Sequence, residues 1–181
     1  MEKKNSHIEE VEKYFDLYHV DVFQFLITFT GNKSDAEDLT QETFMQLIKA
    51  ERTLQNIENP KTWILSIAKH KAIDQYRKRK FLIFFQEKLL HQIPSPLPSP
   101  EELSGREETK AELLNKINAL KANYRLVVIL RSINELTVAE TAAVLNWSES
   151  KVKTTYHRAI KQLKESLKNY SIERGIYHEN A

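Results

Sequence analysis

The sequence predicts an all-α protein made of two small helical domains joined by a proline-rich linker. Apolar residues recur at steps of three or four along most of the 181-residue chain, and no alternating pattern of useful length indicates a strand. Four of the five prolines lie in the stretch IPSPLPSPEEL, which disfavours helix and favours extended chain. We therefore expect a first domain over residues 1–91, a linker over 92–105 and a second domain over 106–181.

Three helices are predicted in the first domain. Gly31 is the C-cap candidate of the first helix. We expect the next helix to begin with a capping box, in which Ser34 caps the backbone and Glu37 reaches back to it. A third helix is expected to start after Asn59, because a proline follows it, and to run toward Lys80. The apolar stripe of the first helix consists of Ile8, Val11, Phe15, Tyr18, Val22, Leu26 and Phe29.

The second domain contains a predicted helix-turn-helix. Thr137 and Glu140 form another capping box, which opens a short helix, and Ser148 caps a longer one. Asn146 lies in the turn between them, where a left-handed backbone is needed and Asn is the best residue other than Gly. Two helices joined by three residues have the spacing of the DNA-binding motif.

Composition narrows the function classes. The chain has no cysteine, which excludes disulfides, cysteine-ligated metals and a cysteine nucleophile, and which favours a reducing cytoplasm. Its three glycines stand far apart, so glycine-rich nucleotide-binding loops are not expected. The histidines are scattered, and the spacing assembles no catalytic group, so no metal, no cofactor and no enzymatic activity are expected. Neither a membrane span nor a signal peptide is indicated.

The helix after Ser148 is predicted to bind duplex DNA. The net charge of the chain is only +2, but cations gather on the face that a major groove would meet. A helical hairpin with a solvated basic face is the alternative. The exposed face offers Ser150, Lys151, Lys153, Thr154, His157, Arg158 and Lys161.

The third helix has a different basic surface. From Lys69 to Lys80 it carries six cations and one acid, a local charge of 6 − 1 = +5. An aromatic ring beside cations is typical of single-stranded nucleic-acid binding, in which each stacked base contributes ~1–3 kcal/mol. In the alternative interpretation, Trp63 is an ordinary core anchor. Helical projection places Trp63, Ser66, His70, Asp74 and Arg77 on one side of this helix.

The second helix is acidic. Four carboxylates, Asp35, Glu37, Asp38 and Glu42, lie within eight residues, with Gln41 among them. Helix capping and the helix dipole account for three of the four, and no histidine stands at ligand spacing. A surface that docks a basic protein partner is therefore a better prediction than a metal site or an acid–base pair.

Three runs of sequence resemble the extracytoplasmic-function sigma factors of the sigma-70 family, over roughly residues 8–167. They are GNKSDAEDLTQETFMQLIKA, NPKTWILSIAKHKAIDQYRKRK and, after the proline-rich stretch, NYRLVVILRSINELTVAETAAVLNWSESKVKTTYHRAIKQLKESL. The segment SESKVKTTYHRA is similar to the sigma-X type in particular. The resemblance implies a cytoplasmic transcription initiation factor that directs RNA polymerase to promoters, in a cell-envelope stress response.

The resemblance also implies three binding surfaces. The first domain would dock the clamp helices of the largest subunit of core RNA polymerase, and the second would also touch the polymerase flap. The loop 53–59 and the helix 62–79 would open and hold the minus-10 element, while the recognition helix would read the minus-35 element. The residues so assigned are Asp35, Asp38, Gln41, Glu42 and Phe44 for polymerase; Asn56, Trp63, Ser66, Lys69, His70, Asp74, Arg77, Lys78 and Arg79 for minus-10 DNA; and Arg125, Ser150, Lys151, Lys153, Thr154, His157, Arg158 and Lys161 for minus-35 DNA.

The chain departs from the family pattern at four positions. His70 stands where the family usually has Asn, Ser66 where Arg is common, Lys121 where Pro is usual, and Asn146 where Gly is usual. The resemblance further implies a membrane-anchored anti-sigma factor as a partner. Such a partner or polymerase would cover the apolar patch Phe81–Phe85, unless the patch completes the first domain's core. A stand-alone helix-turn-helix regulator remains the alternative, although it would need dimer symmetry to bind DNA specifically.

Overall fold

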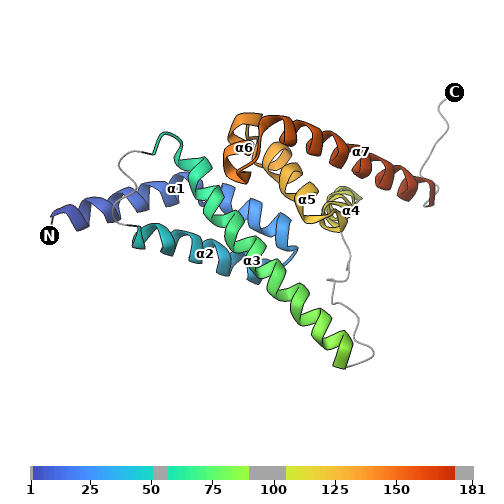
Figure 1. The fold of residues 1–181 in the computed structure, drawn as a ribbon, viewed down its shortest axis with the longest axis horizontal. Coiled ribbons are helices and arrows are strands. Elements are labelled where there is room, and N and C mark those ends of the chain that lie inside the picture. Colours follow the sequence, from blue (N-terminus) through green and yellow to red (C-terminus); the bar gives the residue numbers. More distant parts are fainter. Residues whose placement is uncertain (1, 51–56, 90–104, 174–181) are drawn as a thin grey trace.

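The computed structural model describes residues 2–50, 57–89 and 105–173, and every regular element within these ranges is a helix (Figure 1). The all-α class predicted from the sequence is confirmed. Because the linker predicted over 92–105 lies outside the described residues except for its last residue, the domain boundaries stay a prediction. In chain order the elements are α1 Glu2–Thr30, α2 Lys33–Lys49, α3 Pro60–Leu89, α4 Gly105–Ala119, α5 Ala122–Val128, η2 Ile129–Ile133, α6 Val138–Leu145 and α7 Glu149–Glu173.

A sharp turn separates α1 from α2. Gly31 has a φ of 67°, in the left-handed region, and ends α1 as predicted. The prediction that Ser34 caps α2 is wrong, because Asn32 takes this place. Its backbone is extended, with φ of −136°, and its side-chain oxygen accepts a hydrogen bond from the Asp35 amide at 2.9 Å. The helix therefore begins at Lys33, and Ser34 lies exposed in the first turn.

The third helix begins where the sequence predicts and ends later. The side-chain oxygen of Asn59 caps it by accepting from the Thr62 amide at 3.1 Å. Beyond Lys80 the helix continues through the apolar patch to Leu89, and its C-terminal end projects past the neighbouring helices (Figure 1). Phe81 and Leu82 are 62% and 57% exposed, so these two side chains do not complete the core of the first domain.

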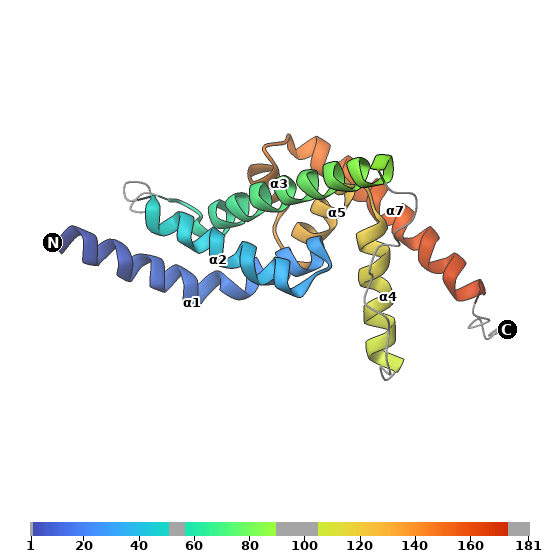
Figure 2. The same cartoon turned by 90° about the horizontal axis from the view of Figure 1, so that it is seen from below.

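In the second half, the helix predicted over 123–133 is divided. After α5 the backbone tightens its hydrogen bonding into the π-helical turn η2, in which the Asn134 amide donates to the Ile129 carbonyl at 3.0 Å. The amide of Leu136 then reaches the Leu130 carbonyl at 2.9 Å and closes the turn into α6. Figure 2 shows α4 extending away from the layer formed by α1, α2 and α3.

One hydrophobic core runs through both halves of the chain. It contains the fully buried Phe25 and Leu65 of the first half together with Leu130 and Val152 of the second. Helix α3 packs against α1 and α2 and also against α6, and η2 packs against α1. The two predicted domains therefore share an interface, and α3 is enclosed on more of its circumference than α7, which packs against α4, α5 and α6.

Candidate nucleic-acid interface

Helices α6 and α7 form the predicted helix-turn-helix, and local hydrogen bonds explain its geometry. The Thr137 hydroxyl accepts from the Glu140 amide, and the Glu140 carboxylate accepts from the Thr137 amide at 2.7 Å, which completes the capping box. Asn146 has φ of 54° and ψ of 50°, the left-handed conformation predicted for the turn. Ser148 accepts from the Lys151 amide at 3.3 Å and starts α7, while Val152 is fully buried beneath it.

The recognition face of α7 is open to solvent. Lys151 lies over the Trp147 ring, 4.1 Å from its centroid, and Lys153 forms a long, exposed ion pair with Glu149 at 3.7 Å. Helix N-terminal side chains of this kind reach base edges and phosphates when the helix enters a major groove. All seven predicted residues of α7 are exposed, namely Ser150, Lys151, Lys153, Thr154, His157, Arg158 and Lys161.

Arg125, predicted as a minus-35 contact, is instead a buried structural residue. Only 9% exposed, it donates to the Phe29 carbonyl at 2.8 Å and to the carbonyls of Asn118 and Leu120. Its guanidinium also lies 5.2 Å from the centroid of the Phe29 ring and 5.9 Å from that of Tyr76. Burial lowers the pKa of Arg125, with Tyr76 opposing the change. The guanidinium thus fastens α5 to α1 and α3 and does not face DNA.

The predicted stripe on α3 is present on its outer side. His70, Asp74 and Arg77 are exposed, and Ser66 is half-buried with its hydroxyl donating to the Trp63 carbonyl at 2.7 Å. Trp63 is itself half-buried and packs partly against the core. The ring therefore has both roles that the sequence left open: one part of it supports the core and another faces solvent beside the basic stripe.

The basic surface of α3 is smaller than its sequence suggests. Lys69 is only 6% exposed, so the prediction that it contacts DNA is wrong for this conformation. Lys71 bonds to Glu42 at 3.1 Å, and Arg79 to Asp35 at 2.8 Å, which ties two further cations to α2. Among the residues assigned to minus-10 DNA, Lys78 is exposed and Asn56 lies outside the described residues.

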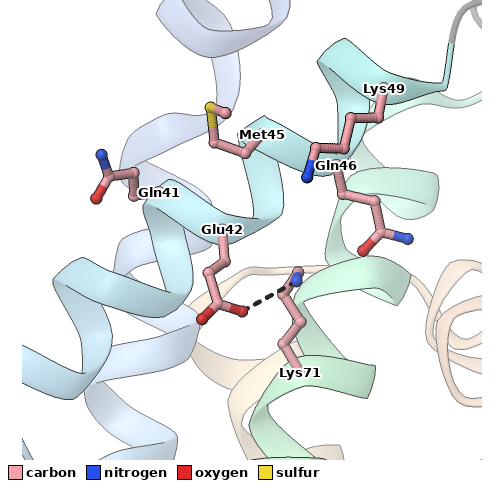
Figure 3. A pocket seen from close by; sticks show the side chains of 6 residues that line it. All are labelled: Gln41, Glu42, Met45, Gln46, Lys49 and Lys71. Carbon is pink, nitrogen blue, oxygen red and sulfur yellow. Dashed lines mark hydrogen bonds and ion pairs between the residues drawn. The ribbon is translucent and has the colours of Figure 1, made fainter.

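The acidic surface lies on the outer side of α2. Asp38, Gln41 and Glu42 are exposed, and Figure 3 shows Gln41 and Glu42 on α2 with Lys71 reaching across from α3. These side chains border an open hollow of about 500 Å³, whose base is formed partly by the apolar Met45. The arrangement offers carboxylate and amide groups around an apolar floor, as a protein-docking surface does.

Two residues assigned to polymerase docking lie elsewhere. Phe44 is 5% exposed and packs edge-on against Phe15, with ring centroids 4.9 Å apart, so it supports the packing of α1 on α2. Asp35 is half-buried and holds Arg79. Side-chain burial is set by the neighbouring helix, and the acidic sequence run alone did not distinguish these two positions from the exposed ones.

Polar contacts across the interface between the two halves were missed by sequence reasoning. The Asn59 amide group donates to Glu140 at 3.0 Å and so joins the cap of α3 to the cap of α6. Asn134, 2% exposed, donates to the Asp21 carbonyl at 2.9 Å, and Lys61 pairs with the Asp21 carboxylate at 2.8 Å. Because these partners are 73 to 113 residues apart where they cross the interface, no local pattern signals them.

Within the described part of the chain, no group of three or more His, Asp or Glu side chains is placed to hold a metal ion. No helix in those ranges is both long enough and apolar enough to cross a bilayer.

The helix-turn-helix and the basic stripe of α3 define a helical DNA-binding protein with two separate nucleic-acid-facing helices. A model of sigma-70 region 2 matches residues 14–81, and a model of sigma-70 region 4 matches residues 110–163. The chain is 34% identical to the extracytoplasmic-function RNA polymerase sigma factor SigX of Bacillus subtilis, over 88% of this chain and 84% of that protein. It is 30% identical to the sigma factor YlaC of the same organism, over 90% and 94%.

The fold is also similar to that of the sigma factor RpoE from Bartonella quintana, solved in complex with the anti-sigma factor NepR. The TM-score is 0.70 at 22% identity, over 87% of this chain and 96% of that one. The chain belongs to the extracytoplasmic-function sigma factors of the sigma-70 family, and it is an RNA polymerase sigma factor that acts in transcription initiation. SigX and YlaC differ by only 34% against 30% identity, so the comparisons support the family more strongly than the sigma-X type.

Proposed function

We propose that three exposed surfaces divide the work of this sigma factor between polymerase and the two promoter elements. The outer side of α2 docks core polymerase, the outer stripe of α3 holds the minus-10 strand, and the recognition face of α7 reads the minus-35 duplex. The observation that carries this division is their separation: the acidic side chains lie on α2, while the exposed basic side chains lie on α3 and α7.

Docking on α2 is supported by chemistry as well as by position. Asp38, Gln41 and Glu42 are exposed together around the hollow, and a carboxylate-rich surface attracts a partner of positive potential. Lys71 sits beside Glu42 and sets its orientation through their 3.1 Å ion pair. We assign the polymerase clamp helices to this surface because the sequence run that contains it resembles the run with that role in the family.

The two DNA surfaces suit different forms of nucleic acid. On α3, the half-buried Trp63 and the exposed Arg77 combine an aromatic ring with a cation, which suits an unstacked base and its phosphate. On α7, Lys153 and Arg158 are exposed on the second helix of a helix-turn-helix, which suits duplex DNA. The protein would carry out this work in the cytoplasm, where polymerase and promoter meet, as a non-enzymatic initiation factor.

An anti-sigma factor is the proposed regulatory partner. Support comes from the likeness in fold to RpoE, which was solved with the anti-sigma factor NepR. Such a partner would inhibit transcription by competing with polymerase for the exposed surface of α2 or by covering the DNA-facing helices.

Charge reversal on α2 tests the division of work. The double substitution Asp38→Lys and Glu42→Lys should weaken capture of purified core polymerase at least about tenfold, since each tenfold change corresponds to about 1.4 kcal/mol and two attractive charges become repulsive. Run-off transcription from a cognate promoter should fall in parallel. Circular dichroism should show unchanged helix content, because both side chains are exposed.

Glu165→Lys is the matched control, because Glu165 is an exposed acid on α7, away from the docking surface. It should capture polymerase as the unmodified protein does. Unchanged polymerase capture by the α2 double variant would refute the docking assignment, and equal weakening by the control would show a general charge effect.

A further inference from the structure

Lys69 and His70 form an unusual pair on α3. The Lys69 side chain is 6% exposed, and its Nζ lies 3.0 Å from Nε2 of the adjacent His70. Burial lowers the pKa of Lys69, because the protein interior disfavours its charged form. Among the interactions of the described residues, this amine has no carboxylate partner. A lysine that carries charge in the interior without a counter-ion reduces stability, so its contact with His70 needs a functional explanation.

The contact determines which nitrogen of His70 carries a proton. An ammonium group has only protons to offer, so the Nε2 atom of His70 must accept, and the proton of the neutral ring then lies on Nδ1. Across the described chain, no hydrogen bond joins Nδ1 to another residue. His70 is exposed, so the ring presents an N–H donor that is available to a ligand.

The surroundings of His70 point to the ligand. It lies on the outer stripe of α3, two helical turns from Trp63 on one side and from Arg77 on the other, with Asp74 one turn away. An unpaired base held by the aromatic ring would meet this stripe edge-on. Where the family usually has Asn, which offers both a donor and an acceptor, the fixed imidazole offers a donor alone.

We propose that His70 determines base specificity in the minus-10 strand by donating from Nδ1 to an acceptor on one unpaired base, and that Lys69 is the positioning residue that fixes this tautomer. The proposal rests on the proposed minus-10 function of α3. It explains why a buried cation is placed on a helix whose core side is otherwise apolar: Lys69 does not reach DNA, but it sets the hydrogen-bonding character of a neighbour that does.

Nitrogen NMR of the free protein tests the tautomer directly. The ¹⁵N shifts of the His70 ring distinguish a protonated from an unprotonated ring nitrogen, and in the unmodified protein they should show the proton on Nδ1 at neutral pH. In Lys69→Met the population should move toward the Nε2-protonated form. An unmodified protein with its proton on Nε2, or an unchanged spectrum in Lys69→Met, would overturn the proposal.

A selection experiment tests base specificity. Holoenzyme assembled from each variant and core polymerase is incubated with single-stranded DNA randomised across the minus-10 region, and the bound fraction is sequenced. His70→Ala and Lys69→Met should both lose the preference at one and the same position, by about 5- to 100-fold, the range of a good base contact. Lys69→Gln, which still has a donor for Nε2, should retain part of the preference.

Lys78→Met is the matched control, because Lys78 is an exposed lysine on the same helix. It should weaken binding of all sequences evenly and leave the preference unchanged. Loss of preference at different positions in His70→Ala and Lys69→Met, or a preference kept by Lys69→Met, would overturn the proposal while leaving the minus-10 function of α3 intact. If the unmodified holoenzyme selects no sequence at all, the minus-10 assignment itself fails.

Unfolding measurements separate positioning from simple structural support. Lys69→Met should be at least as stable as the unmodified protein in urea, because Met has a similar size and removes a desolvated amine. A residue with only a structural role would show the reverse. A variant that is clearly destabilised and loses binding to all sequences together would therefore contradict the role assigned to Lys69.

Discussion

The two nucleic-acid-facing helices, α3 and α7, differ in how much of each is available to DNA. Both are long and rich in cations, but α3 lies against α1, α2 and α6, whereas all seven predicted contact residues of α7 are exposed. On α3, Lys69 is buried and Lys71 and Arg79 bond to acids of α2. A count of basic residues therefore describes α7 well and overestimates the DNA-facing surface of α3.

The difference teaches that enclosure changes the work done by a charged residue. On α7, a cation remains solvated and contributes to phosphate attraction in proportion to the number of contacts. On α3, the same residue type becomes part of the packing, as a link to α2 in Lys71 or as a partner of His70 in Lys69. Substitutions on the two helices should accordingly separate folding from DNA binding.

The largest expected effect comes from removing the arginine that fastens α3 into place. Arg125→Ala leaves the Phe29 and Leu120 carbonyls without their donor and removes a cation from two aromatic faces, so the free energy of unfolding should fall by about 3 kcal/mol or more. Urea unfolding at pH 7 measures this loss. Arg158→Ala on α7 should unfold like the unmodified protein, because Arg158 is exposed. Equal stability of both variants would contradict the structural role of Arg125.

Trp63 sharpens the comparison because its ring is shared between core and surface. Trp63→Ala should reduce open-complex stability by ~1–3 kcal/mol through lost stacking, and partial loss of core contacts should lower the melting temperature as well. Trp63→Phe keeps an aromatic face and should restore much of the promoter opening. Permanganate footprinting and thermal melts measure the two effects separately. Full promoter opening by Trp63→Ala would exclude a stacking role.

Much of this fold is predictable from local signals in the sequence. Asn59 before a proline, the Thr137 capping box and Asn146 in the turn each act through backbone groups a few residues away, and the structure confirms all three. The cap of α2 was assigned wrongly because Asn32 and Ser34 are both good capping residues, and the tight turn at Gly31 selects the first.

The sequence did not predict which side chains of the candidate site are buried. Lys69, Phe44 and Arg125 belong to stretches whose neighbours are exposed, and only the packing of distant helices encloses them. Arg125, for example, bonds to a carbonyl 96 positions away. Helical periodicity identifies the outer side of an isolated helix, but α3 has neighbours on several sides, and their positions depend on long-range contacts.

A smaller effect is expected on the open helix. Lys153→Ala and Arg158→Ala should each weaken binding of holoenzyme to a minus-35 duplex and reduce the salt dependence of that binding by about one unit of slope, if each contacts one phosphate. Fluorescence titration over a series of salt concentrations gives the slope. Opening of a preformed minus-10 bubble should not change. Equal loss on both templates would contradict the division of work between α3 and α7.

The smallest expected effect concerns the bond between the caps of α3 and α6. Hydrogen bonds from the backbone and side chain of Thr137 lower the pKa of Glu140 below its model value of 4.5, with Asn59 and Lys61 adding to the effect and burial opposing it. Because the folded pKa is the lower one, this stabilisation is present above the unfolded pKa and is lost as the pH falls through the folded pKa. Glu140→Gln should therefore be less stable than the unmodified protein by about 1 kcal/mol at pH 7, the usual contribution of a cap, and the difference should shrink below about pH 4.5. Urea unfolding at several pH values measures it, with Glu165→Gln as a control on exposed surface that should change stability at pH 7 by less than about 0.5 kcal/mol. A difference that grows as the pH falls would have the wrong sign and would show that the Glu140 carboxylate does not hold the two caps together.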